Sequence, residues 1–194
     1  MSTQLFINAH IATGMPGSTA AETAAIQDIL VEDGKFISIA PNLKATLEAQ
    51  GKDMASVEVV DLGGKLVCPP FCDTHLHLDY VFTARKPGAV NESGTLFEGI
   101  QRWSETKADL TVDEIKERAK IGIAKEMRHG VQFIRSHADV TDPNLTSLKA
   151  LLELKEELKD TVTLQIVSFP QEGMYSYEGP HGESGAELVE EGLK

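Results

Sequence analysis

After residue 64 the sequence alternates between strand and helix patterns, and this alternation constrains the fold more than any other feature. Short apolar or β-branched runs are separated by amphipathic stretches that carry helix-capping residues. Strands separated by helices pair in parallel within one sheet, and the helices pack on its faces. The expected strands cover residues 65–71, 131–137 and 161–169, and the expected helices cover 94–107, 111–129 and a stretch that opens at Asp142-Pro143.

The helix boundaries are marked by specific capping signals. Thr111 and Glu114 have the spacing of a capping box, and Gly130 stands where a glycine commonly ends a helix. Asp142 and Pro143 are expected to be the N-cap and the first-turn proline of the next helix. The leucines of that helix are expected to form core: Leu145, Leu148, Leu151, Leu152 and Leu158.

Residues 1–64 show strand patterns and no long helix, which indicates a separate small β domain before residues 65–194. Strands are expected over residues 4–12 and 56–64. Between them, residues 26–40 predict a hairpin, because its Asp-Gly pair tolerates the positive φ of a two-residue turn. Residues 41–55 fit either a loop or a short helix.

Composition limits the partners that this chain can have. Its 194 residues include 18 Lys and Arg against 30 Asp and Glu, which gives a formal net charge of −12. Such an acidic surface repels phosphate backbones, so nucleic-acid polymers are excluded while a single uncharged base stays possible. No apolar run reaches the roughly 20 residues of a membrane span, and the start shows no export signal. The two cysteines indicate a reducing, cytoplasmic setting.

The segment CPPFCDTHLHLDY, residues 68–80, places two histidines directly after an apolar run. Residues two apart in a strand point to the same face, so His75 and His77 would share one metal ion if the strand continues to residue 77. Neutral imidazole binds zinc and iron well, and parallel α/β folds gather their chemistry at the carboxyl ends of strands. Asp79 would orient a ligand or hold the loop. A surface turn with two incidental histidines is the competing interpretation.

The longer segment GGKLVCPPFCDTHLHLD, residues 63–79, resembles the amidohydrolase superfamily, in which a P-G-F-[IV]-D-x-H-x-H strand supplies two metal ligands. Pro70 stands where many members have glycine, and Cys72 where an aliphatic residue is usual. The resemblance covers residues 56–194, and the N-terminal strands more weakly. Three later segments are similar to the bacterial cytosine deaminases: SGTLFEGIQRW (93–103), RSHADVTDPNLTSLKALLELKEEL (135–158) and LQIVSFPQEG (164–173).

This resemblance implies an α/β fold: the first three strand–helix units of a (β/α)8 TIM-type barrel, preceded by part of a small β-sandwich domain. It implies one divalent metal ion, iron or zinc, on His75 and His77. Gln171 would hydrogen-bond the amide edge of a pyrimidine, and Leu96 would line the substrate pocket. Metal-activated water would convert cytosine to uracil and ammonia. Relatives that favour isoguanine, aminotriazines or other cyclic amides leave the exact substrate open, and the full-length protein is expected to be a homo-oligomer.

The resemblance also implies catalytic groups that the sequence does not offer. They are a third metal-binding histidine, an acid/base glutamate with a second histidine, and a metal-binding aspartate. A barrel needs about 250 residues, whereas residues 65–194 supply 130. We therefore expect these groups beyond Lys194. A non-catalytic fragment that acts only with a complementary chain is the alternative from a different functional class.

Other side chains carry weaker signals. Cys68 and Cys72 are expected to be buried apolar residues, because the rigid proline step between them makes a poor zinc knuckle. His137 fits either a role beside the metal or the pocket, or a satisfied position in the core. Asp139 is expected to fix the turn that follows it, and Glu172 to form a salt bridge or loop contact. The remaining histidines are interpreted as incidental: His10, His129 and His181.

Overall fold

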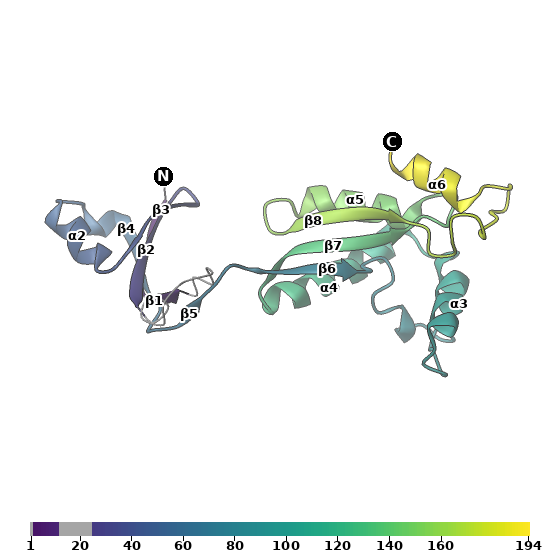
Figure 1. The fold of residues 1–194 in the computed structure, drawn as a ribbon, viewed down its shortest axis with the longest axis horizontal. Coiled ribbons are helices and arrows are strands. Elements are labelled where there is room, and N and C mark those ends of the chain that lie inside the picture. The colour runs from purple at the N-terminus through teal and green to yellow at the C-terminus, as the bar shows by residue number, and fades with distance from the viewer. Residues whose placement is uncertain (1, 12–24) are drawn as a thin grey trace. The chain divides into compact units, whose positions relative to one another are not determined.

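The computed structural model describes residues 2–11 and 25–194, and the chain divides into two compact units, Met1–Pro69 and Pro70–Lys194 (Figure 1). Each unit has its own sheet and its own buried core, so the architecture is mixed α/β. Within the described ranges, no helix is both long enough and apolar enough to cross a membrane.

A five-stranded sheet forms the first unit. Its central strand β1 pairs with β2 in antiparallel and with β4 and β5 in parallel orientation, and β3 completes the order β3-β2-β1-β4. Residue 12, the expected end of the first strand, lies outside the described residues. A small core unites the sheet with helix α2 through Leu5, Leu30, Leu43 and Val57. The bounds are β1 Thr3–Ile11, β2 Ile26–Glu32, β3 Lys35–Ala40, α2 Leu43–Ala49, η1 Met54–Ser56, β4 Val57–Asp61 and β5 Leu66–Val67.

The hairpin between β2 and β3 confirms the turn predicted from sequence. Asp33 and Gly34 both have positive φ, at 48° and 75°. Positive φ at both central residues matches the right-handed twist of the flanking strands, which is why this dipeptide favours hairpins. Residues 41–55, which fitted either a loop or a short helix, contain both the helix α2 and the short helix η1.

Three parallel strands in the order β6-β7-β8 form the sheet of the second unit, which confirms the predicted alternation of strands and helices. Helices α4 and α5 pack against each other and against β7 (Figure 1). The fully buried side chains of this core include Ile115, Ile134, Leu151 and Leu154. The bounds are β6 Phe71–Leu76, η2 Thr83–Arg85, α3 Leu96–Lys107, α4 Val112–Arg128, β7 Val131–Asp139, α5 Thr146–Glu157, β8 Thr163–Phe169 and α6 Gly185–Gly192.

The capping signals of α4 are confirmed. The Thr111 hydroxyl accepts the backbone N–H of Glu114, and the Glu114 carboxylate accepts the backbone N–H of Thr111. Gly130 follows the last turn with φ 86°, a conformation that glycine adopts without steric cost. The predicted ends of this helix therefore fall within one residue of the observed ones.

The strand expected over residues 65–71 is wrong. Leu66–Val67 forms β5 in the first unit, and β6 begins only at Phe71. Pro69 and Pro70 separate the two strands, because proline has no N–H to donate to a ladder. His75 therefore lies in a strand that starts after the prolines, and His77 directly follows the last residue of that strand, Leu76.

The helix start expected at Asp142-Pro143 is also wrong, because α5 begins at Thr146. Asp142 instead closes the preceding turn. Its two carboxylate oxygens accept the backbone N–H groups of Asn144 and Thr146 at 3.0 and 2.9 Å. This local turn satisfies the N–H groups that a helix starting at Pro143 would have needed to cap.

Three side chains expected in the core are exposed instead. Leu152 is 47% exposed, because the buried side of α5 carries Leu151 and Leu154 and leaves residue 152 on the opposite side. Cys72 lies on β6, an edge strand of the three-stranded sheet, and its side chain is exposed. Cys68 is exposed in the segment between β5 and β6.

Candidate active site

His75 and His77 bring their imidazoles together at the carboxyl end of β6. Their Nε2 atoms are 3.3 Å apart, although the strand ends before the second histidine. Two nitrogens that bind one tetrahedral metal at about 2.1 Å each would lie about 3.4 Å apart. The observed separation therefore matches that of two ligands of a single ion.

The ring of His77 is oriented by the neighbouring strand. Its Nδ1 lies 3.0 Å from the backbone carbonyl oxygen of His137, so Nδ1 carries the proton and donates it to that oxygen. The lone pair of the imidazole is then at Nε2, the atom that faces His75. Burial lowers the pKa of His77, which favours the neutral ring that metal binding requires.

His137 lies against the pair and completes a cluster of three imidazoles. Its ring stacks on that of His75 with 4.1 Å between centroids. Burial lowers its pKa, and its Nδ1 is buried with no hydrogen-bond partner in the described part of the chain. A buried nitrogen of this kind indicates a position where water or a ligand group completes the site.

The hydrogen bonds of Asp79 fix the loop after β6 and do not involve the two histidines. Its side chain is fully buried, and Oδ2 accepts the backbone N–H of Asp139 at 2.8 Å. Burial raises the pKa of this carboxyl to about 7. Arg118 donates to the backbone carbonyl of Asp79 at 2.8 Å, which fixes the same loop against α4. Of the two roles expected for Asp79, these contacts match the second.

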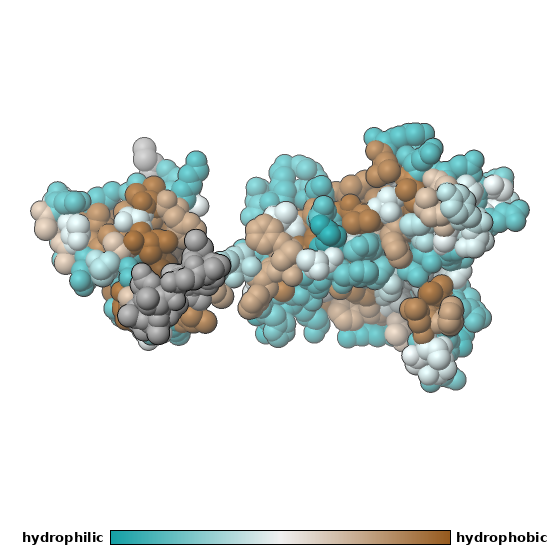
Figure 2. All heavy atoms as spheres, in the orientation of Figure 1, coloured by the Kyte–Doolittle hydropathy of each residue, from teal (hydrophilic) through white to brown (hydrophobic). Residues whose placement is uncertain are grey.

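A cavity of about 380 Å³ opens between the start of α3 and the end of β8. Gln171 and Leu96, the two residues implied in substrate binding, both line it. Leu96 is 73% exposed at the edge of the cavity, and Figure 2 shows apolar atoms gathered over α3. The other lining residues are Tyr80, Asn91, Gly94, Thr95, Gly99, Ile100 and Trp103.

Tyr80 connects this cavity to the histidines. Its ring stacks on His77 with 4.7 Å between centroids and also lies 4.7 Å from the ring of Trp103. A flat ligand in the cavity would therefore lie beside the same aromatic ring that contacts the candidate metal ligand. The cavity and the histidine pair therefore share one aromatic neighbour, Tyr80.

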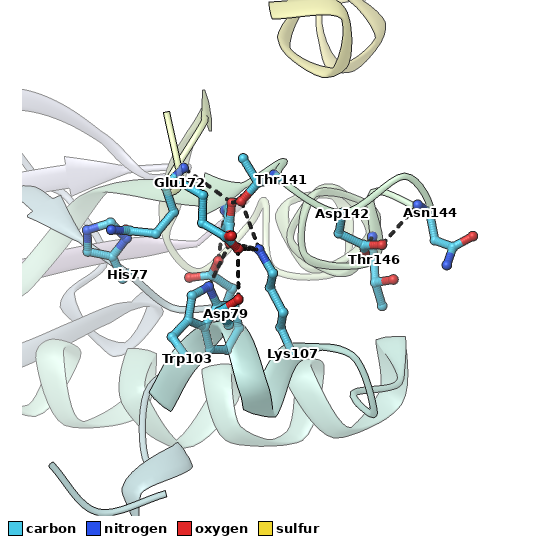
Figure 3. A network of polar contacts seen from close by, with 12 residues as sticks. His77, Asp79, Trp103, Lys107, Thr141, Asp142, Asn144, Thr146 and Glu172 are labelled. Carbon is cyan, nitrogen blue, oxygen red and sulfur yellow. Dashed lines mark hydrogen bonds and ion pairs between the residues drawn. The ribbon is translucent and has the colours of Figure 1, made fainter. Parts of the chain in front are cut away.

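Figure 3 shows a network of polar contacts that includes Trp103, Lys107 and Glu172. Several of these contacts converge on Asp139, the last residue of β7. Its Oδ2 accepts from Trp103 Nε1 at 2.7 Å and from Lys107 Nζ at 3.0 Å. Its Oδ1 accepts the backbone N–H of Thr141 at 2.8 Å, so it fixes the following turn as expected. Lys107 also pairs with Glu172, which confirms the salt bridge predicted for that glutamate.

The sequence model of the amidohydrolase family matches residues 58–191, a range that holds both histidines and every residue lining the cavity. The chain belongs to the amidohydrolase family. Within the family, it is similar to a 5-methylcytosine deaminase of known structure.

Three relatives give the scale of the similarity. The crystal structure of 5-methylcytosine deaminase from Klebsiella pneumoniae liganded with 5-fluorocytosine is 37% identical, with a TM-score of 0.77 over 97% of this chain and 40% of that chain. N-isopropylammelide isopropyl amidohydrolase of Pseudomonas sp. (strain ADP) is 30% identical over 80% of this chain and 37% of the relative. Pterin deaminase of Rhizobium rhizogenes is 28% identical over 76% and 32%, respectively. The chain thus spans 40% or less of these relatives' length.

Amidohydrolases generally depend on a metal ion, and the histidine pair fits one through its nitrogen spacing and the fixed ring of His77. The fit is to part of a ligand set. Across residues 2–11 and 25–194, no three His, Cys, Asp or Glu side chains gather as a metal site. Catalytic zinc sites have three protein ligands, so at least one more is needed.

The sequence analysis gave no functional role to Tyr80, Trp103 or Lys107. Tyr80 directly follows the motif that carries the histidines, and this position in the sequence indicates that its side chain lies near them. Trp103 lies in the segment 94–107, which was expected only to be helical, and its hydrogen-bond partner Asp139 is 36 positions away in sequence. A contact at that range leaves no local pattern.

Proposed function

We propose that this family member carries part of the active site of a metal-dependent deaminase that hydrolyses cytosine to uracil and ammonia. The observation that carries the proposal is the cavity lined by Gln171 and Leu96, which adjoins two imidazoles spaced as ligands of one ion. The 37% identity to a 5-methylcytosine deaminase supports the pyrimidine as substrate.

In this proposal, the three parallel strands β6, β7 and β8 are the first strands of a (β/α)8 barrel. The unit Pro70–Lys194 belongs to the barrel, and the unit Met1–Pro69 contributes to a small β-sandwich. Barrel enzymes place their active sites at the carboxyl ends of the strands. His75 near the end of β6, His77 just after it, His137 on β7 and Gln171 after β8 all lie at those ends.

A divalent ion, iron or zinc, would be held by Nε2 of His75 and His77, and it would supply water with a lowered pKa. The protein keeps His77 in the correct tautomer through the carbonyl of His137. Burial keeps the same ring neutral, so it remains able to bind a cation. The ring of Tyr80 covers one side of His77 and restricts solvent there.

Gln171 is assigned to recognise the base. Its side-chain amide offers one acceptor and two donor hydrogens, which match the ring nitrogen and carbonyl of a pyrimidine edge. Trp103 and Tyr80 supply aromatic walls, and Leu96 supplies an apolar contact at the edge of the cavity. A flat, uncharged base satisfies all these groups, whereas a phosphate would add charge to a chain with a net charge of −12.

The test is release of ammonia from cytosine by the full-length protein, before and after removal of metal with a chelator. We expect activity that is lost on chelation and restored by zinc or ferrous iron. Formation of uracil in equal amount to ammonia would identify hydrolytic deamination. Ammonia release that survives complete metal removal would contradict the proposal.

A second candidate substrate follows from the relative in Pseudomonas. N-isopropylammelide isopropyl amidohydrolase is 30% identical over 80% of this chain. Its name describes removal of an alkylated amine from a ring, a reaction of the same chemical class. Comparing kcat/KM for cytosine, isoguanine and N-isopropylammelide separates the candidates. The cavity residues Gln171 and Leu96 favour cytosine.

A further inference from the structure

Asp139 is the common partner of structural elements that are far apart in sequence. Its carboxylate is 1% exposed and lies at the carboxyl end of β7. From α3, Trp103 and Lys107 donate to Oδ2 at 2.7 and 3.0 Å. From the segment after β8, the backbone N–H of Gln171 donates to Oδ1 at 3.3 Å. One buried side chain thus ties the helix and the strand end together.

Two of these partners line the cavity from different elements. Trp103 contributes an aromatic ring from α3, and Gln171 contributes its amide from the end of β8. Asp139 does not line the cavity itself. Its effect on a bound base must therefore pass through the two residues that it holds.

We propose that Asp139 is a positioning residue that sets the spacing between the aromatic wall and the amide of Gln171, and so determines how tightly a flat base binds. The inference rests on the proposed function, because it takes the cavity to be the base-binding site. It adds a residue that acts on specificity without touching substrate.

A carboxylate suits this task better than an amide of the same shape. Every observed partner of the two oxygens is a donor: the indole N–H, the ammonium of Lys107, the N–H and hydroxyl of Thr141 and the N–H of Gln171. Replacing one oxygen by NH2 leaves either the two donors at Oδ2 or the three donors at Oδ1 facing another donor. Trp103 or Gln171 would then lose its anchor while the volume of the side chain stays the same.

The first test is steady-state kinetics of Asp139→Asn in the full-length protein. We expect KM for cytosine to rise about tenfold with kcat changed less than about threefold, because contacts made equally before and during reaction affect binding alone. Metal content should stay at the wild-type value. Asp142→Asn is the matched control, since that carboxylate also accepts turn N–H groups but contacts neither Trp103 nor Gln171.

The second test reads the anchor directly and needs no activity. In protein labelled with 15N-tryptophan, the indole N–H resonance of Trp103 is assigned by its absence in Trp103→Phe. Asp139→Asn should move this resonance and speed its exchange with solvent, whereas Asp142→Asn should leave it unchanged. The indole N–H is the donor that meets the carboxylate, so its signal reports on this hydrogen bond.

The outcomes separate the inference from the proposed function. Wild-type protein that is inactive on cytosine would refute the substrate, while a shifted indole resonance in Asp139→Asn would still support the anchoring role. An unchanged resonance, or a KM no higher than that of Asp142→Asn, would overturn the inference. If Asp139→Asn does not fold, Trp103→Phe removes one anchor and keeps a ring. Its KM should rise about threefold for one lost hydrogen bond, and an unchanged KM would overturn the inference.

Discussion

The carboxyl ends of β6 and β7 are neighbours in one sheet, yet they hold their polar groups in opposite ways. At the end of β6, His75 and His77 face each other through their Nε2 atoms, and Oδ1 of the buried Asp79 has no hydrogen-bond partner among the described residues. At the end of β7, both oxygens of Asp139 accept several hydrogen bonds.

This difference teaches which groups are free to bind a ligand. An unpaired buried polar atom costs free energy, so a fold keeps one only where something else completes it. A fully paired carboxylate has no acceptor capacity left for a ligand and serves to fix its neighbours. The two histidines at the β6 end are therefore free to bind a ligand, whereas Asp139 at the β7 end fixes its neighbours.

The largest effect is expected when the hydrogen bonds of Asp139 are removed. Asp139→Ala should lower the free energy of unfolding by about 3 to 5 kcal/mol, because Lys107 and the indole N–H of Trp103 lose a buried charged partner. Urea denaturation of the full-length protein measures this loss. Asp142→Ala, at a half-buried turn, should cost only about 1 kcal/mol. Equal costs for the two variants would remove the contrast between the strand ends.

The next largest effect is expected when the two histidines at the end of β6 are removed. Replacing His75 and His77 together by alanine should lower metal affinity at least about a hundredfold, with little loss of thermal stability in the metal-free protein. Elemental analysis after gel filtration gives the metal content per chain. His181→Ala, at an exposed loop histidine, is the control and should keep the metal. Full metal content in the double variant would show that the ion binds elsewhere.

A smaller effect is expected at Gln171, which lines the cavity. Gln171→Ala should reduce kcat/KM for cytosine by about tenfold or more, which corresponds to about 1.4 kcal/mol. The loss arises because the polar edge of the base would be buried without a partner. Metal content should not change. A kinetically silent substitution would make Gln171 a loop residue without a role in recognition.

The smallest effect is expected at Glu98, in the first turn of α3. Glu98 accepts the backbone N–H groups of Glu92 and Ser93 at 3.1 and 2.7 Å, and hydrogen bonds from Ser93 lower its pKa to about 2. A lowered carboxyl pKa adds stability above its ordinary value of 4.5, and this stability is lost as the pH falls toward 2.

Glu98→Gln should therefore be less stable than the wild type at pH 6, and the difference should shrink as the pH falls below 4.5 toward 2. Urea denaturation at several pH values measures both proteins. Glu190→Gln, an exposed position on α6, is the control and should follow the wild type throughout. A difference that stays constant with pH would show that the carboxylate charge is not the cause.

Local signals in the sequence predicted much of the fold. The capping box at Thr111 and the turn at Asp33-Gly34 depend on residues within a few positions of each other, so their patterns are complete in a short segment. The two histidines are likewise a local motif, and their meeting at one point follows from their spacing. Family resemblance added Gln171 and Leu96, which line one cavity.

The rest depended on contacts that no short segment contains. The hydrogen bond from Trp103 to Asp139 joins a helix to a strand end, and neither residue signals the other in sequence. The helix start at Asp142 was predicted wrongly because a capping residue and a turn-closing residue use the same side-chain oxygens. The break between β5 and β6 was missed because apolar residues continue on both sides of the prolines.

The break at Pro69-Pro70 prevents a change of strand register in one sheet from passing to the other. A slip of one residue in strand register turns every side chain of a strand to the opposite face. Had β5 and β6 been one continuous strand, such a slip in the first unit would have turned the histidines to the opposite face of their strand. Pro69 and Pro70 cannot donate to a ladder, so strand pairing is interrupted there. Pairing resumes at Phe71, and the register of β6 is set there by its partner Val131. The first unit is thereby free to accumulate sequence changes while the alignment of the histidines persists.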